Sequence, residues 1–365
     1  MKVLFTTNIP SPYRVDFFNE LGRYCDLTVL FESKIDKSRD RNWIADKFSN
    51  FKAIFMKGIK IGEADAFCPE IIKFLSLKKF DVIVIGAYHT PSGMLAIQYM
   101  KIKNIPFILN TDGGIKKEDS GIKHKVKENF ISAASGWLST GRVTSDYLEN
   151  YGAKKDKIYV YPFTSIKKVD ILEKPLSLDG KIKIREKLNI REDKMILSVG
   201  QFVHRKGFDV LLKAGNKIDR NVGIYIVGGK PTAEYIKMQK DMNLTNVHFI
   251  DFMQKDELSN YFKAADLFVL PTREDIWGLV INEAMAYGLP VITTKKCVAG
   301  IEMVEDYTGN LVEVDDANSL AEEIEKVLND KKVTNPEKCI EIAKQYSIEN
   351  MAKRHYSIFT KFLNS

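Results

Sequence analysis

The stretch LPTREDIWGLVINEAMAYGLPV, residues 270–291, combines the end of an apolar run, a turn and a helical pattern. The apolar run that starts at residue 267 is typical of a buried strand, and residues 278–287 are apolar in the manner of a buried helix. Gly288 and Pro290 follow at positions where helices commonly end. A buried strand, a turn and a buried helix form the repeating unit of parallel sheets, so this stretch predicts an α/β fold.

Two carboxylates interrupt this apolar stretch. Asp275 falls in the turn, and Glu283 falls about two turns into the helix. A solvated helix has a polar face, but this one offers only Asn282 and Glu283, so we expect it to be buried. A buried carboxylate needs a hydrogen-bonding partner. We therefore favour a ligand site over the alternative in which Asp275 is a helix cap and Glu283 a solvated surface residue.

The start of this helix predicts an anion site. Backbone N–H groups in the first turn of a helix have no intrahelical acceptor, and they present positive charge to a phosphate. These groups belong to Trp277, Gly278, Leu279 and Val280. Gly278 lets a phosphate approach closely. Glu283 lies on the same face as Leu279 but one turn further along, where it can accept hydrogen bonds from hydroxyls such as a ribose diol.

The alternation of strand and helix patterns extends over the whole chain in two halves. The apolar runs of the first half are residues 2–7, 26–32, 81–87, 106–112, 136–141 and 158–163, and those of the second half are residues 195–202, 223–229, 247–252, 267–272, 290–295 and 309–314. A charged connector broken by Pro175 and Gly180 separates the halves. We expect two doubly wound domains with parallel sheets, and ligands in the cleft at the carboxyl ends of their strands.

Length and composition agree with two soluble domains. The 365 residues exceed the usual size of one core, and 45% hydrophobic with 28% charged residues is typical of globular chains. The chain has no run of about 18 uncharged apolar residues that would span a membrane. The apolar run before Asn8 is too short for a secretory signal. Four scattered cysteines predict neither disulfides nor a zinc site, which favours a cytoplasmic location.

Positive charge is concentrated in the first half. Residues 1–168 carry 27 Lys and Arg against 18 Asp and Glu, and the remainder carries 28 against 30, so the net charges are +9 and −2. This asymmetry favours an anionic partner for the basic half, with an ordinary solvated surface as the alternative. The sequence has no zinc-finger, RNP or helix-turn-helix pattern, so we expect contact with an anionic membrane surface and no nucleic acid.

The spacing of Asp275 and Glu283 resembles that of the retaining glycosyltransferases of family 4, which have the GT-B fold. In that family a loop acid, seven spacers and a helical glutamate lie among the GLV, EAMA and GLPVITT segments that this chain keeps. The chain departs from the pattern where Asp275 replaces the usual glutamate. The resemblance covers nearly the whole chain and implies two Rossmann-like domains, residues 1–168 on the acceptor side and 169–345 on the nucleotide-sugar side. Residues 346–365 would form a helix that crosses back to the first domain.

The segment ILSVGQFVHRKGFDVLLKA, residues 196–214, resembles the phosphate-binding region of that family. Lys206 takes the place of the family's phosphate-binding lysine. Gln201 replaces a usual arginine, for which the neighbouring Arg205 can compensate. Two cations and Gly207 after a strand end provide the charge, donors and room that a diphosphate needs. A solvated His-Arg-Lys turn is the alternative.

The first half of the sequence gives fewer indications of its functional residues. NIPSPYRVDFFNEL, residues 8–21, resembles a subgroup associated with bacterial surface polysaccharides such as capsule and lipopolysaccharide. Asp112 follows an apolar run where related enzymes carry His or Asp near the reacting carbon, and a turn residue is the alternative. His89 is a second candidate, with a structural role favoured. The lysine-rich tract 115–138 predicts either an interfacial patch or a plain solvated helix.

The resemblance implies a retaining, hexosyltransferase-type enzyme. It would move a sugar from a nucleotide-diphosphate sugar, with UDP as the expected base, to a hydroxyl of a glycan or lipid-linked glycan. Lys206, Arg205 and the amides around Gly278 would stabilise the departing diphosphate in place of a metal. Glu283 would hold the ribose hydroxyls, and Asp275 would hold hydroxyls of the donor sugar. We expect no cofactor, and a cytoplasmic enzyme that can also be peripheral at the inner face of the cell membrane.

Other functions stay open for this architecture. A nucleotide-sugar epimerase or a phosphorylase could share the GT-B fold, and an epimerase would show no acceptor requirement. The hypothesis of a non-catalytic adaptor in a glycan assembly complex is based on the departures from the family pattern at Gln201 and Asp275. Such an adaptor would bind no nucleotide. An NAD-dependent oxidoreductase and a P-loop protein are disfavoured, because VGQFVHRKG and GGKPT lack the required glycine patterns.

Overall fold

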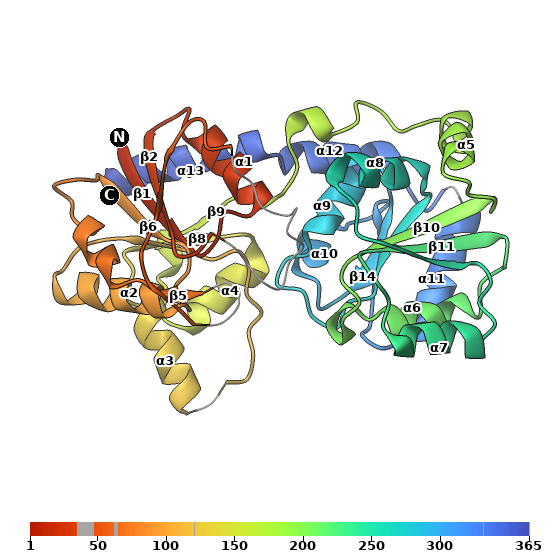
Figure 1. Cartoon of the computed structure of the whole chain (residues 1–365), viewed down its shortest axis with the longest axis horizontal. Coiled ribbons are helices and arrows are strands. Elements are labelled where there is room, and N and C mark those ends of the chain that lie inside the picture. The colour runs from red at the N-terminus through yellow and green to blue at the C-terminus, as the bar shows by residue number, and fades with distance from the viewer. Residues whose placement is uncertain (35–46, 62–64, 120, 331, 365) are drawn as a thin grey trace. The chain divides into compact units, whose positions relative to one another are not determined.

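The chain folds as two compact units. A computed structural model describes residues 1–34, 47–61, 65–119, 121–330 and 332–364. The first unit comprises Met1–Lys167 and Tyr346–Ser365, and the second comprises Lys168–Gln345. Each unit is built on a parallel sheet with helices around it (Figure 1). The second unit begins at Lys168, one residue before the predicted range 169–345. Across the described ranges, no helix is long and apolar enough to cross a membrane.

The described part of the first unit contains a parallel sheet of seven strands. These are β1 (Lys2–Thr7), β2 (Asp26–Phe31), β3 (Lys52–Phe55), β6 (Val82–Ile85), β7 (Ile108–Asn110), β8 (Gly136–Ser139) and β9 (Ile158–Val160), in the order β3-β2-β1-β6-β7-β8-β9. A short antiparallel pair, β4 (Ile59–Lys60) and β5 (Ala66–Phe67), is separate from this sheet. Val3, Leu4 and Phe5 on β1 are all fully buried, because helices cover both faces of the sheet.

Two groups of helices enclose the first sheet. One face packs against α2 (Pro91–Ile102), α3 (Ile122–Ile131), α4 (Arg142–Asn150) and the 3₁₀ helix η1 (Pro69–Phe74), and a second 3₁₀ helix, η2 (Lys155–Lys157), precedes β9. The other face carries α1 (Pro12–Leu21) and α13 (Ile348–Leu363), which lie side by side (Figure 1). Phe5 of β1 contacts Phe18 of α1 edge to face, with ring centroids 5.0 Å apart. The C-terminal segment thus completes the core of the first unit.

The helix α1 begins at Pro12. Its buried apolar residues Val15, Phe18 and Leu21 recur at helical spacing, and its bounds are Pro12–Leu21. Proline is favoured at the first helical position, because its fixed φ suits the helix and its missing N–H would have no intrahelical acceptor there. The sequence SPY therefore starts the helix at Pro12.

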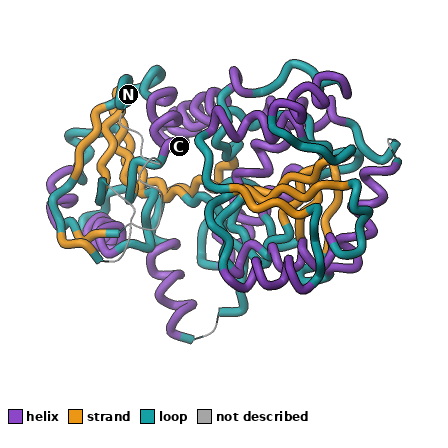
Figure 2. Tube along the Cα trace, turned by 45° about the vertical axis from the view of Figure 1, so that its right-hand side comes forward, coloured by secondary structure: helices purple, strands orange, loops and turns teal. Residues whose placement is uncertain are grey.

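The second unit has, over its described residues, a parallel sheet of six strands. These are β10 (Lys194–Val199), β11 (Val222–Val227), β12 (Val247–Ile250), β13 (Leu267–Leu270), β14 (Val291–Thr294) and β15 (Gly309–Val312), in the order β12-β11-β10-β13-β14-β15. Figure 2 shows these strands as one layer with helices on both sides. The order reverses between β10 and β13, and ligands of doubly wound sheets bind at such a reversal.

Helices again form the outer layers of the second unit. One face packs against α6 (Phe208–Gly215), α7 (Ala233–Asp241) and α11 (Ala317–Asn329). The remaining helices are α5 (Leu178–Lys187), α8 (Lys255–Ala264), α9 (Leu279–Ala286), α10 (Val298–Met303) and α12 (Pro336–Gln345), with 3₁₀ turns η3 (Lys168–Asp170) and η4 (His204–Lys206). The helix predicted over residues 278–287 is α9, which packs against α12. The two parallel sheets confirm the predicted α/β class.

Candidate functional site

Three loops meet at the carboxyl edge of the second sheet. They follow β10, β13 and β14, which are neighbours in that sheet. The loop after β10 contains η4 with Arg205 and Lys206, and the loop after β13 contains Asp275. The loops after β13 and β14 pair through Asp275 and Cys297: Asp275 N–H donates to Lys296 O at 2.9 Å, and Val298 N–H donates to Asp275 O at 3.1 Å. The site that the sequence predicted is therefore assembled from residues up to about 90 positions apart.

The η4 turn is fixed against the end of β13. The backbone N–H of Arg273 and the hydroxyl of Thr272 both donate to Arg205 O, at 2.8 and 2.9 Å. Gly207 follows with φ of +70°, and a Cβ on it would lie 2.0 Å from Pro271 O. A larger residue cannot occupy that position without moving the backbone, so Gly207 lets the cationic turn lie against the β13 loop.

The carboxylate of Asp275 pairs with both cations of η4. Its Oδ2 lies 2.7 Å from Lys206 Nζ and 3.3 Å from Arg205 Nη1. Asp275 is 8% exposed and the Lys206 side chain 12%, whereas the Arg205 side chain is 48% exposed. The structure thus brings the predicted acid and the predicted phosphate-binding cations into direct contact. Binding of Asp275 to donor-sugar hydroxyls stays a prediction.

The start of α9 is shaped by Gly278. This residue is the N-cap and has φ of +100°, and a Cβ on it would lie 2.7 Å from Cys297 Sγ. The first helical residues are Leu279 and Val280, whose N–H groups belong to the turn where a helix leaves its amides without intrahelical acceptors. Ile281 N–H already donates to Gly278 O at 2.8 Å. Glycine at this position keeps the helix start free of side-chain atoms that would block an anion.

The side chain of Trp277 has a structural role. The indole is buried, and its Nε1–H donates to Asn282 Oδ1 at 2.8 Å. Asn282 is 1% exposed, as expected for a helix with too few polar residues to face solvent. A buried indole N–H needs an acceptor, and Asn282 supplies it one turn along α9. Only the backbone of Trp277 can serve the predicted donor site.

Cys297 beneath this helix start is an unreactive thiol. Burial, reinforced by the charge of Asp275, raises its pKa to about 12. Its Sγ donates to Trp277 O at 3.3 Å. The neutral thiol therefore packs under Gly278 and introduces no charge into the site.

Glu283 is half-buried on α9, one turn before Tyr287. Burial raises the pKa of Tyr287 to about 12, and the negative charges of Asp170 and Glu283 add to this shift. Glu283 therefore lies close enough to Tyr287 to influence the pKa of that tyrosine. Its binding of ribose hydroxyls stays a prediction.

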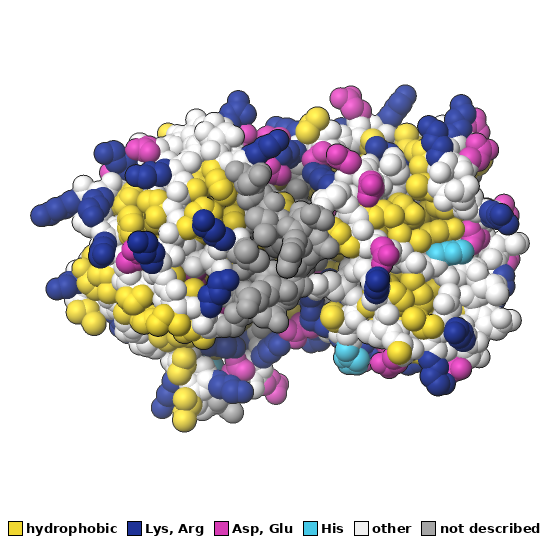
Figure 3. All heavy atoms as spheres, in the orientation of Figure 1, with side chains coloured by type: hydrophobic (Ala, Val, Ile, Leu, Met, Phe, Trp, Pro, Cys, Tyr) yellow, Lys and Arg dark blue, Asp and Glu magenta, His cyan; other side chains and the backbone are white. Residues whose placement is uncertain are grey.

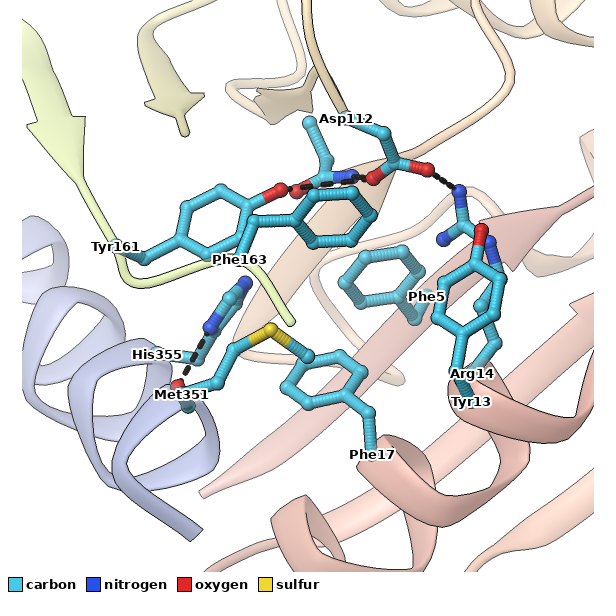
Figure 4. A pocket seen from close by; sticks show the side chains of 10 residues that line it. Phe5, Tyr13, Arg14, Phe17, Asp112, Tyr161, Phe163, Met351 and His355 are labelled. Carbon is cyan, nitrogen blue, oxygen red and sulfur yellow. Dashed lines mark hydrogen bonds and ion pairs between the residues drawn. The ribbon is translucent and has the colours of Figure 1, made fainter. Parts of the chain in front are cut away.

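Asp112, the remaining predicted catalytic residue, lies in the first unit just after β7. It forms an ion pair with Arg14 of α1, and its Oδ1 accepts from Asn110 Nδ2 at 2.9 Å (Figure 4). Tyr161 O–H lies 3.5 Å from the same oxygen. Arg14, which lies in the NIPSPYR segment, was not predicted as a site residue. His89 is exposed and its ring lies 5.8 Å from that of Tyr88, which gives it no place in this cluster.

The described residues contain no group of three or more His, Cys, Asp or Glu side chains placed to hold a metal ion.

Known proteins resemble this chain in its fold and in the sequence of its second unit. Residues 180–346 match the family described as glycosyl transferases group 1. The chain is 30% identical over 196 residues to an uncharacterized glycosyltransferase of Methanocaldococcus jannaschii, a match that covers 50% of this chain and 49% of that protein. It is 29% identical over 292 residues to an uncharacterized 41.2 kDa protein in the cps region of Klebsiella pneumoniae, covering 74% and 76%. HepE of Anabaena, solved in complex with UDP, superposes with a TM-score of 0.77 at 17% identity, covering 99% of this chain and 100% of HepE.

Two parallel α/β units with a cationic loop at the carboxyl edge of the second sheet define the class of fold, and the chain has the GT-B fold. The match to the glycosyl transferases group 1 falls almost wholly within the second unit. The match spans about half the length of the archaeal relative and three quarters of the Klebsiella protein. The predicted GT-B class is confirmed, whereas family 4 and the retaining mechanism stay predictions.

Proposed function

We propose that this chain is a retaining, metal-independent glycosyltransferase. It transfers a sugar from a UDP-sugar to a hydroxyl of a glycan or lipid-linked glycan during assembly of a bacterial surface polysaccharide. The proposal rests on the contact of Lys206 and Arg205 with Asp275 beside the glycine-led start of α9, in a unit that matches the glycosyl transferases group 1. UDP in the HepE structure supports the donor base. The cps region of the Klebsiella relative supports the pathway class.

The proposed reaction assigns a task to each part of this site. The bond from the anomeric carbon to the diphosphate breaks, and negative charge develops on the departing oxygen. Lys206, Arg205 and the amides that open α9 stabilise this charge. The acceptor hydroxyl attacks from the face that the diphosphate leaves, and its proton passes to the leaving phosphate. Glu283 holds the ribose of the donor, and Asp112 orients the acceptor hydroxyl.

Nucleotide binding tests the donor site. We expect UDP, among UDP, GDP, ADP and NAD, to raise the melting temperature of the purified chain. Glu283→Ala should weaken UDP binding about 10-fold to 100-fold, because two ribose hydroxyls lose their acceptor. Glu322→Ala on α11 is the matched control, since Glu322 is exposed in the middle of a helix. Equal UDP affinity in wild type and Glu283→Ala would refute the ribose assignment, and the lack of a shift with any nucleotide would favour the adaptor.

Removal of metal ions tests the second part of the proposal. We expect EDTA to leave the rate of UDP release unchanged, because two cationic side chains already lie where the diphosphate would depart. The measurement compares turnover with EDTA, with added Mg²⁺ and with added Mn²⁺. A loss of activity in EDTA that either ion restores would show that the cations do not suffice.

The proposed function includes peripheral contact with an anionic membrane through α3. Ile122 is 82% exposed and Val126 44%, and Lys123 and Lys125 stand beside them on the same helix. Figure 1 shows α3 projecting from its unit, and Figure 3 shows apolar and basic side chains together on that projection. Apolar residues flanked by lysines favour the interface of an anionic bilayer. Of the tract 115–138, residue 120 lies outside the described residues.

Vesicle binding tests this contact. We expect the chain to co-sediment with vesicles containing phosphatidylglycerol more than with phosphatidylcholine vesicles. The double variant Lys123→Glu/Lys125→Glu should lower the affinity for anionic vesicles at least about tenfold, because each surface lysine contributes about 1 kcal/mol. The exposed pair Lys154→Glu/Lys155→Glu, with the same change in net charge, is the control. Equal losses in both double variants would mean that net charge, not α3, determines binding.

A further inference from the structure

A narrow pocket opens at the carboxyl edge of the first sheet. Segments far apart in the sequence supply its lining: β1, α1, the end of β7, the segment after β9, and α13 (Figure 4). Phe5, Phe17, Phe163 and Met351 form apolar walls, and Tyr13 is half-buried at the rim. Its central space is about what one water molecule needs, so it suits a single small group and not a whole sugar ring.

Unsatisfied oxygen atoms cluster at this edge. Within the described residues, the buried side-chain oxygen and nitrogen atoms that lack a hydrogen-bond partner are Thr6 Oγ1, Thr7 Oγ1, Ser11 Oγ, Asn110 Oδ1 and Thr111 Oγ1. All five belong to the ends of β1 and β7 or to the loop between β1 and α1. Asn110 is 2% exposed and lines the pocket. A buried polar atom without a partner is costly, so Asn110 Oδ1, which alone of the five belongs to a residue lining the pocket, indicates a place where a ligand completes the hydrogen bond.

The charges in the pocket cancel. Asp112 pairs with Arg14, which is 9% exposed. Asp112 also accepts from Asn110 Nδ2, and Tyr161 O–H lies 3.5 Å away. His355 adds no charge, since burial lowers its pKa to about 4 and its Nδ1–H donates to Met351 O at 2.8 Å. An anionic group would have to displace Asp112 from Arg14 within a buried site, which is unfavourable.

The chemistry of Asn110 Oδ1 further restricts which functional group can bind. This oxygen is an acceptor only, so its partner must be a donor. A carboxylate or a phosphate dianion offers no donor, whereas a hydroxyl offers one and fits the size of the pocket.

We infer that this pocket accepts an uncharged hydroxyl or hydroxymethyl group of the acceptor glycan, which donates a hydrogen bond to Asn110 Oδ1. The inference rests on the proposed function, because it takes the first unit as the acceptor side. It assigns a recognition residue, Asn110, and it specifies the class of acceptor: a neutral sugar at this position, not a uronic acid or a sugar phosphate.

Saturation-transfer NMR on the full-length chain tests this assignment. The probes are the methyl glycosides of glucose, galactose, mannose and N-acetylglucosamine, compared with the methyl glycosides of glucuronic and galacturonic acid. The glucose and galactose probes differ from their acid counterparts only by a hydroxymethyl in place of a carboxylate. We expect saturation transfer to at least one neutral probe and a signal at least fivefold smaller for the acid probes.

Two variants separate recognition from folding. Asn110→Leu keeps the approximate volume and removes the acceptor, and should weaken binding of the neutral probe about fivefold to tenfold, the effect of one lost hydrogen bond. Tyr13→Ala removes part of the half-buried rim and should weaken the same probe, so the test stands even if Asn110→Leu fails to fold. Asn260→Leu, at an exposed position of α8 in the second unit, is the control.

The outcomes distinguish this inference from the function on which it rests. Equal signals in wild type and Asn110→Leu, stronger binding of the acid probes, or no signal from any neutral probe would overturn the pocket assignment. UDP binding is measured on the same samples. A UDP shift that persists while the pocket assignment fails leaves the proposed function in place, whereas a wild-type chain that does not bind UDP would refute the proposed function itself.

Discussion

Replacing Lys206 with alanine is expected to lower turnover by about 10²-fold to 10³-fold while changing the KM for the donor much less. The ammonium group of Lys206 lies in the turn after β10 at the carboxyl edge of the sheet, beside the start of α9. Its charge matters most when the bond to the diphosphate breaks, because the negative charge on the leaving oxygen then grows. The measurement is UDP release at varied donor concentration, which separates kcat from KM.

A structural explanation of the Lys206→Ala result can be checked directly. The substitution also removes a cation 2.7 Å from the buried carboxylate of Asp275, so some loss of thermal stability is expected. The double variant Lys206→Ala/Asp275→Asn should recover that stability without recovering turnover. Lys240→Ala, at an exposed site on α7, is the control for charge removal. If donor affinity falls as much as kcat, Lys206 binds the ground state and the leaving-group role is wrong.

Replacing Asp275 with asparagine is expected to have opposite effects on nucleotide binding and on turnover. The carboxylate occupies Lys206 and Arg205, and it repels any diphosphate that approaches them. Removing its charge should therefore tighten UDP binding about fivefold to tenfold, or about 1 kcal/mol. Turnover should fall, because the proposed contact with donor-sugar hydroxyls becomes weaker. Calorimetric titration with UDP and UDP-release kinetics measure the two effects.

The control for this experiment is Asp256→Asn at an exposed position of α8. Weaker UDP binding in Asp275→Asn would show that the carboxylate acts mainly by holding Lys206 in place. Unchanged turnover would remove Asp275 from the catalytic set. The two readouts together therefore separate competition with the diphosphate from positioning of the lysine.

Strands buried on both faces were the elements that sequence reasoning located best. β1 and β10 are nearly continuous apolar runs, because helices cover both faces of each sheet. β3 (Lys52–Phe55) was missed, since it is a short edge strand with no fully buried side chain. The helix α9 was predicted within one residue at each end, because Gly278 and Gly288 mark its limits.

The partners of the site residues could not be predicted from the sequence. The pattern indicated Lys206 and Asp275 separately, but their contact joins residues 69 positions apart. The pair of Arg14 and Asp112 spans 98 positions. Asn282 lies on a helix that was expected to be buried, but its role as the acceptor for Trp277 was not predicted. Such pairings depend on which loops the sheet order brings together, and local periodicity contains no information about that order.

The placement of α13 has a consequence for the order in which the chain can mature on the ribosome. The second unit is one uninterrupted segment, Lys168–Gln345, so all its strands have been synthesised before α13 emerges. Most of the first unit is synthesised earlier. One face of its sheet, however, lacks the packing of α13 until residues 348–363 have left the exit tunnel. During that interval Phe17 lacks the ring contact that it makes with His355 of α13 in the complete fold. The half of the molecule translated first is therefore the half that finishes folding last.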